Sequence, residues 1–116
     1  RKKEIAERYT QAFATQAAIS MTLPTSQHVT NSYWLYTILL KNDSRGLLNN
    51  LAENAIQTRP LWKALCDLPY LQQCHIHSAA NSRTLTKNAL SIPSSVSLSE
   101  TDQEKVIQSI KNYFRG

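Results

Sequence analysis

The spacing of apolar residues predicts a helix at each end of the chain. Apolar side chains recur every three or four positions at both ends, which is the period of one face of an α-helix. Ser99 and Asp102 form a capping-box-like start for the second helix. The two faces consist of Ile5, Ala6, Tyr9, Ala12 and Phe13, and of Val106, Ile107, Ile110, Tyr113 and Phe114. We expect their four aromatic side chains to lie in the core.

A continuous apolar run predicts the central strand of a sheet. Residues 33–40 are rich in aromatic and β-branched residues with almost no polar alternation, which is typical of a strand covered on both faces. Tyr33 and Trp34 are therefore expected in the core. Residues 56–58 predict a short strand stopped by Pro60, and residues 91–96 an extended segment in which Pro93 favours a strand start or a sheet edge. The polar residues 25–32 predict a loop.

Two shorter helices are expected between these strands. The polar residues 42–44 offer caps for a helix that ends at Asn54 or Ala55, and residues 81–90 predict another helix. Residues 61–71 contain at most a helical turn, which Pro69 breaks. The order of elements predicts a small α/β fold, with helices covering a sheet, in one domain over residues 1–116.

Composition excludes several classes of protein. The chain has 116 residues, 41% of them hydrophobic, and its longest apolar stretch is far shorter than the roughly 20 residues of a membrane span. No secretory signal opens the sequence, so we expect a cytoplasmic protein without membrane contact. The only glycines, Gly46 and Gly116, exclude the glycine-rich loops that cradle phosphates.

The net charge of +5 does not indicate nucleic-acid binding. Without the tripeptide of residues 1–3, ten basic and eight acidic side chains remain, a net charge of +2 scattered along the chain. A nucleic-acid interface needs its basic residues clustered on one face. The first helix also begins without a capping residue, which predicts a segment cut from a longer chain.

Side chains that carry chemistry are few. Cys66, Cys74, His75 and His77 are the one cluster able to bind a metal, but their spacing matches no zinc pattern and favours a polar surface loop with reduced thiols. Acidic residues near position 100 are explained by helix capping, and no G-x-S-x-G elbow occurs. We therefore assign no catalytic residue and no metal site.

Several segments together resemble the C-terminal domain of the DegT-type sugar aminotransferases. The order of these segments along the whole chain matches that family. The form Thr58-Arg59-Pro60-Leu61-Trp62 is most similar to members that aminate UDP-linked 4-keto-6-deoxy-N-acetylhexosamines on the way to legionaminic-acid-like or bacillosamine-like sugars. One departure is Asn54-Ala55, where many relatives have glycine before the isoleucine; Asn54 tolerates a left-handed helix end, so we expect the turn to be kept. The other matching segments are Arg8-Tyr9, Ser32 to Tyr36, Leu68-Pro69-Tyr70, Ile92 to Ser95 and Ser97 to Gln103.

The resemblance implies a small α+β domain with three to four mostly antiparallel strands, from an enzyme dependent on pyridoxal phosphate. Such an enzyme takes an amino group, usually from glutamate, and passes it to a 4-keto-6-deoxy sugar linked to a nucleotide. In this family the cofactor lysine lies in a large N-terminal domain, so none is assigned here and the chain alone is expected to be inactive. The implied partners are that large domain and a second subunit of a homodimer.

Two residues are candidates for binding substrate. Arg59 either pairs with an anionic group of the nucleotide sugar, or forms a salt bridge to Glu53 or to the rest of the enzyme. Trp62 either borders the sugar nucleotide or packs at the domain interface.

The alternative is a stand-alone module that binds another protein and has no catalytic role. If the chain belongs to a larger enzyme, we expect exposed apolar surface along the first helix and around Trp62. In a stand-alone module, the uncapped start, residues 61–71 and Trp62 would form the partner-binding patch.

Overall fold

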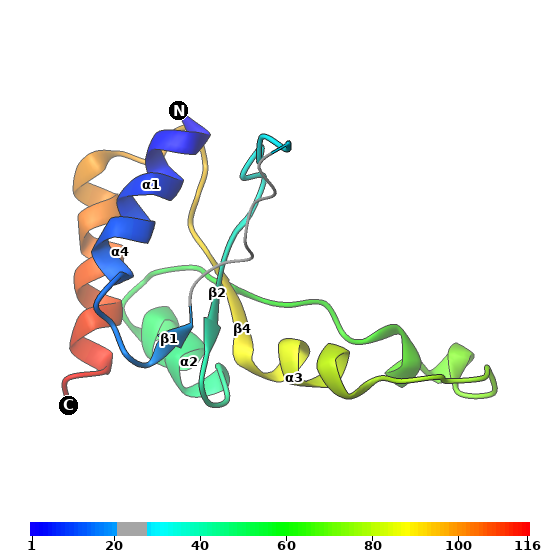
Figure 1. Cartoon of the computed structure of the whole chain (residues 1–116). Coiled ribbons are helices and arrows are strands. Elements are labelled where there is room, and N and C mark those ends of the chain that lie inside the picture. The colour runs from blue at the N-terminus through cyan, green and yellow to red at the C-terminus, as the bar shows by residue number, and fades with distance from the viewer. Residues whose placement is uncertain (21–27) are drawn as a thin grey trace.

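The computed structural model describes residues 1–20 and 28–116, so the first three residues of the expected loop over 25–32 lie outside it. Helices and strands alternate along most of the described chain (Figure 1). In chain order they are α1 (Lys2–Phe13), β1 (Ile19–Ser20), β2 (Tyr36–Leu40), α2 (Arg45–Glu53), β3 (Arg59–Pro60), the 3₁₀ turns η1 (Leu65–Asp67) and η2 (Pro69–Leu71), α3 (Ala80–Asn88), β4 (Ala89–Ile92) and α4 (Glu100–Tyr113).

The described strands form a four-stranded antiparallel sheet in the order β1-β2-β4-β3. This confirms the α+β fold and the central position of β2. The register pairs Tyr36 with Ile92 and Leu39 with Ala89. The expectation that β2 is covered on both faces is wrong: buried and half-buried residues alternate along it, because helices cover one face more fully than the other.

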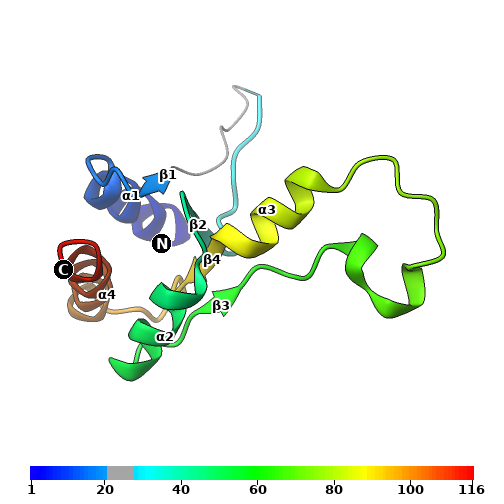
Figure 2. The ribbon, with the colours of Figure 1, turned by 90° about the horizontal axis from the view of Figure 1, so that it is seen from below.

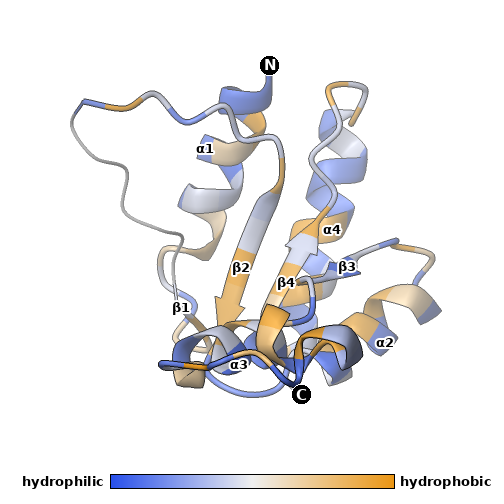
Figure 3. Ribbon diagram, turned by 90° about the vertical axis from the view of Figure 1, so that its right-hand side faces the viewer, coloured by the Kyte–Doolittle hydropathy of each residue, from blue (hydrophilic) through white to orange (hydrophobic). Residues whose placement is uncertain are grey.

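The hydrophobic core lies between the sheet and helices α1, α2 and α4. Helices α1 and α4 lie side by side, and the chain ends at the far end of α4 (Figures 1 and 2). Hydrophobic residues concentrate on β2 and β4, whereas the ribbon of α4 is largely hydrophilic (Figure 3). Tyr9 and Phe13 are buried as expected and Phe114 packs against the core. The expected core position of Tyr113 is wrong: this last residue of α4 is 37% exposed, because it lies at the end of the helix.

Two tyrosines bring hydroxyl groups into this core. The Tyr9 hydroxyl donates a hydrogen bond to the Pro93 carbonyl at 2.8 Å, and the Tyr36 hydroxyl lies 2.9 Å from the Thr10 hydroxyl. Burial raises the pKa of both tyrosines above the ordinary value, so both hydroxyls stay protonated at neutral pH.

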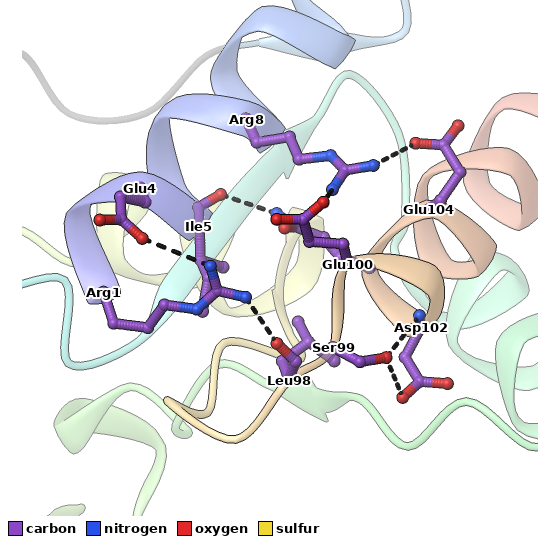
Figure 4. Close-up of polar contacts among 10 residues, drawn as sticks. Arg1, Glu4, Ile5, Arg8, Leu98, Ser99, Glu100, Asp102 and Glu104 are labelled. Atoms are coloured by element: carbon purple, nitrogen blue, oxygen red, sulfur yellow. Dashed lines mark hydrogen bonds and ion pairs between the residues drawn. The ribbon is translucent and has the colours of Figure 1, made fainter.

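Polar contacts tie α1 to the start of α4 (Figure 4). Arg8 pairs with Glu104 at 2.8 Å, and the buried Gln103 donates a hydrogen bond to the Ile5 carbonyl at 2.8 Å. Ser99 caps α4 as predicted, since its hydroxyl accepts a hydrogen bond from the Asp102 backbone at 3.0 Å. Because the buried Gln103 amide is hydrogen-bonded to the Ile5 carbonyl, it fixes how the two helices lie against each other.

Helix α2 ends in a Schellman motif. The backbone N–H of Ile56 bonds to the Leu51 carbonyl at 2.8 Å, and that of Ala55 to the Ala52 carbonyl at 3.0 Å. The turn expected from the sequence is therefore kept. The left-handed residue, however, is Ala55 with φ 58°, and Asn54 has an ordinary φ of −88°.

The prolines displace two predicted strands. The short strand lies at Arg59–Pro60 rather than residues 56–58, because Pro60 can occupy an edge strand that needs no N–H from it. Strand β4 ends at Ile92, so Pro93 follows a central strand instead of beginning one.

At the start of α2, Ser44 is the N-cap, but its hydroxyl donates a hydrogen bond to the Lys87 carbonyl at 2.9 Å instead of capping the helix. The Asp43 carboxylate instead accepts the hydrogen bond from the N–H of Arg45 at 2.8 Å.

Residues 61–79 form an arm that projects from the sheet and returns through α3 (Figures 1 and 2). The radius of gyration is 15.4 Å, against about 13 Å for a compact domain of this length. Within the described residues, no helix combines the length and apolar character that crossing a bilayer requires.

Candidate functional site

The edge strand β3 carries Arg59 at the rim of the sheet. Arg59 pairs with Ser91 and Pro60 with Leu90, which fixes the strand against β4 and leaves the Arg59 side chain exposed. The salt bridge to Glu53 considered from the sequence is absent, and Arg59 has no ion pair within the described ranges 1–20 and 28–116. Its guanidinium group therefore has its hydrogen-bond donors available for an anionic partner.

Trp62 lies near the start of the arm and is 72% exposed. Its carbonyl accepts a hydrogen bond from the Thr86 hydroxyl at 3.0 Å, so α3 fixes the backbone from which the indole projects. The indole lies against that of Trp34, with 6.3 Å between the ring centroids and 41° between the planes. Residues that are far apart in the sequence thus form one aromatic surface.

Trp34 is not a core residue, contrary to the sequence-based prediction. It is 69% exposed and precedes β2, which begins only at Tyr36. Tyr33 adopts φ 50°, and this left-handed turn redirects the chain before the strand. The Asn31 side chain accepts a hydrogen bond from the Tyr33 N–H at 2.8 Å, and Lys2 donates one to the Trp34 carbonyl at 3.0 Å. Tyr33 itself packs partly against the core.

Arg59, Trp62 and Trp34 line one cavity of about 260 Å³, together with Pro60 and Ser91. The structure thus brings together the two residues predicted from the sequence and adds Trp34, which sequence analysis missed. A guanidinium group beside two indoles suits a ligand that carries both an anion and a planar ring. Whether Arg59 and Trp62 contact substrate stays a prediction.

A second, larger groove of about 630 Å³ lies between the arm and α3. Arg83 of α3 reaches Asp67 of the arm, with its Nη2 atom 2.8 Å from the carboxylate. The hydrogen bond from Arg83 lowers the pKa of Asp67 below the ordinary value, so this tie is charged at neutral pH. Large apolar side chains on the arm are exposed, as expected around Trp62; they are Leu65, Tyr70 and Ile76. The expected apolar surface along α1 is absent from the described residues, because the apolar face of α1 packs into the core.

The cysteines and histidines of the arm border this groove. Cys66 and Cys74 are both free, and residues 74–77 form an irregular segment rather than a strand. In the described part of the chain, no three side chains of His, Cys, Asp or Glu are gathered as a metal site would require. The cluster has the geometry of a surface loop.

The described residues do not fit pyridoxal phosphate. The cofactor needs a lysine amine and a carboxylate that reaches its pyridine nitrogen. Lys63 lines the larger groove, but no Asp or Glu lines either cavity, and the Lys41, Lys87 and Lys105 side chains are exposed. We therefore assign no residue of this chain to the cofactor and derive no chemical step from it.

Residues 1–111 match the DegT/DnrJ/EryC1/StrS aminotransferase family. No curated protein matches the sequence significantly. Solved structures similar to this chain share its fold at low identity, and the chain covers less than a third of the length of each of the three described next.

The aminotransferase TlmJ from Streptoalloteichus hindustanus has 23% identity and a TM-score of 0.88, over 98% of this chain and 31% of its own. Helicobacter pylori PseC, an aminotransferase involved in the biosynthesis of pseudoaminic acid, has 18% identity and a TM-score of 0.85, over 98% and 32%. The PLP form of Spr1654 from Streptococcus pneumoniae has 21% identity and a TM-score of 0.82, over 98% and 30%.

Proposed function

Because the chain belongs to the DegT/DnrJ/EryC1/StrS aminotransferase family, we propose that it is the small C-terminal domain of a sugar aminotransferase dependent on pyridoxal phosphate. The whole enzyme passes an amino group from glutamate to the keto group of a 4-keto-6-deoxy sugar linked to a nucleotide. Its product serves bacterial surface polysaccharides, of the legionaminic-acid or bacillosamine type. The observation that carries the proposal is the match of residues 1–111 to this aminotransferase family, and the cavity that Arg59 and Trp62 share at the sheet edge supports substrate binding by this domain.

In this proposal the rest of the enzyme supplies the cofactor lysine and its acidic partner. Pyridoxal phosphate, when bound there, stabilises the electrons released at the carbon that gains or loses the amino group. Residues 1–116 form one small domain that closes the substrate cleft. Arg59 binds an anionic part of the nucleotide sugar, and Trp62 excludes water from the cleft.

The exposed arm is evidence for a large interface between this domain and the rest of the same enzyme. Leu65, Tyr70 and Ile76 expose apolar surface that an isolated domain rarely carries, and a covering partner removes this cost. We propose that the large domain of the same chain covers it, and that the enzyme is a homodimer. The free thiols of Cys66 and Cys74 support a cytoplasmic location, where thiols stay reduced.

The test is amino transfer by the full-length protein. It is incubated with pyridoxal phosphate, glutamate and a UDP-linked 4-keto-6-deoxy-N-acetylhexosamine, and the amino sugar is detected by mass spectrometry. We expect product from the full-length protein and none from the 116-residue chain alone. Turnover by the 116-residue chain would refute its assignment as a non-catalytic domain.

The exposed arm also favours the alternative of a stand-alone protein-binding module. Two observations together distinguish these functions. No amino transfer by the full-length protein with any nucleotide-linked keto sugar, together with binding of another protein that Leu65→Ala and Tyr70→Ala abolish, would replace the enzyme hypothesis.

A further inference from the structure

Trp34 is exposed to solvent because the preceding residue, Tyr33, adopts a backbone conformation that is unfavourable in free energy. A φ of 50° is uncommon for a bulky residue such as Tyr33, and the turn persists because Asn31 and Lys2 hydrogen-bond to its backbone. Such strain is typical of ligand-binding sites, where it orients a side chain that the core does not need. The turn therefore places the Trp34 indole at the surface, where a ligand can reach it.

Trp34 and Trp62 form an aromatic wall rather than a slot. A planar ring inserted between two others needs about 7 Å, or two van der Waals separations of about 3.5 Å. The centroids of these indoles are only 6.3 Å apart. A ligand ring must therefore stack on the open side of the wall, over the cavity that Arg59 shares.

The charge of Arg59 distinguishes between the occupants of this site. An apolar segment packed over the wall would desolvate a guanidinium group that has no ion pair in the described residues. Burying an unpaired charge is costly, whereas an anionic ligand compensates for it. The cavity of about 260 Å³ is smaller than the roughly 300–1,000 Å³ of most ligand sites, so it fits one part of a ligand.

We propose that the Trp34–Trp62 wall stacks with the nucleobase of a nucleoside diphosphate whose diphosphate Arg59 binds. This inference rests on the proposed function and identifies Trp34 as a substrate-binding residue. Stacking needs only the face of a base and tolerates different bases. UDP and dTDP should therefore bind with similar affinity at this wall.

The experiment is calorimetric titration of the full-length protein with UDP and with inorganic pyrophosphate. Trp34→Ala should weaken UDP binding roughly five- to a hundredfold and leave pyrophosphate binding unchanged. Trp34→Phe should restore most of the UDP affinity, because it restores a stacking surface. Arg59→Ala should weaken the binding of both UDP and pyrophosphate. Tyr113→Ala removes an exposed aromatic ring outside the cavity and should change neither affinity.

Three results would overturn the inference. The first is wild-type protein that does not bind UDP. The second is Trp34→Ala protein with unchanged UDP affinity and a lowered melting temperature, which would assign the wall to packing. Amino transfer with an unchanged KM in Trp34→Ala would reject the inference and keep the proposed function. UDP binding through Trp34 without any amino transfer would keep the inference and reject the proposed function.

Discussion

Ala55 ends helix α2 in a left-handed conformation, so replacing it with glycine should stabilise the fold. The two Schellman hydrogen bonds require a positive φ at this position, and Ala55 supplies it at 58°. The Ala55 side chain is exposed, so its removal leaves no cavity. Leu51 and Ile56, which flank the motif, are buried and keep their packing in the variant.

The expected magnitude follows from two opposing terms. A non-glycine residue in the left-handed region costs about 1–2 kcal/mol, which Ala55→Gly recovers. Glycine loses more conformational freedom on folding, which costs roughly 0.5–1 kcal/mol. The balance is a gain of about 0.5–1 kcal/mol in the free energy of unfolding, or a rise of roughly 2–5 °C in Tm.

Thermal unfolding followed by circular dichroism measures this shift. Ala52→Gly is the matched control, because Ala52 is also exposed but has helical backbone geometry. The control should lower stability by about 1 kcal/mol. Identical chemical changes three residues apart should thus act in opposite directions. If Ala55→Gly lowered Tm as Ala52→Gly does, the left-handed assignment of Ala55 would be wrong.

Three further predictions concern α4 and the arm. Ser99→Ala removes the hydroxyl that caps α4 and should cost about 1 kcal/mol, seen as a lower denaturant midpoint. Because Arg83 lowers the pKa of Asp67, the tie it makes stabilises the fold above the ordinary carboxyl pKa and is lost as pH falls through the lowered one. Arg83→Gln should raise the pKa of Asp67 in a carboxyl NMR titration; an unchanged pKa would refute the tie. Iodoacetamide should label the exposed Cys74 faster than the half-buried Cys66, which peptide mass spectrometry resolves.

The helices could be predicted from the sequence because their signals are local. Periodic apolar residues and the Ser99 cap define α4 without reference to any other segment, and the structure confirms both. The short strands could not be placed this way, because pairing with β4 decides their position. Arg59–Pro60 becomes a strand only because Ser91 and Leu90 lie opposite.

Two residues of the candidate site could be predicted from the sequence, and the third, Trp34, could not. Arg59 and Trp62 stand together in a proline-marked turn, so a sequence pattern points to both. Trp34 belongs to an apolar run that favours burial, and only the left-handed turn at Tyr33 brings it to the surface. The signal available in the sequence was Asn31, since asparagine often bonds to a backbone N–H two residues ahead.

The measurement that tests the central claim most directly compares Arg59→Ala with Arg45→Ala in the full-length enzyme. Arg45 is also exposed but lies outside the cavity. For amination of the nucleotide-linked keto sugar, Arg59→Ala should raise KM roughly tenfold or more with kcat and Tm nearly unchanged, because a charge-assisted hydrogen bond made equally in the ground and transition states affects binding alone. Arg45→Ala should change none of the three. An unchanged KM in Arg59→Ala would contradict the claim. If Tm were lowered as well, Arg59 would stabilise the domain interface rather than bind substrate. If Tm were also unchanged, Arg59 would be removed from the site.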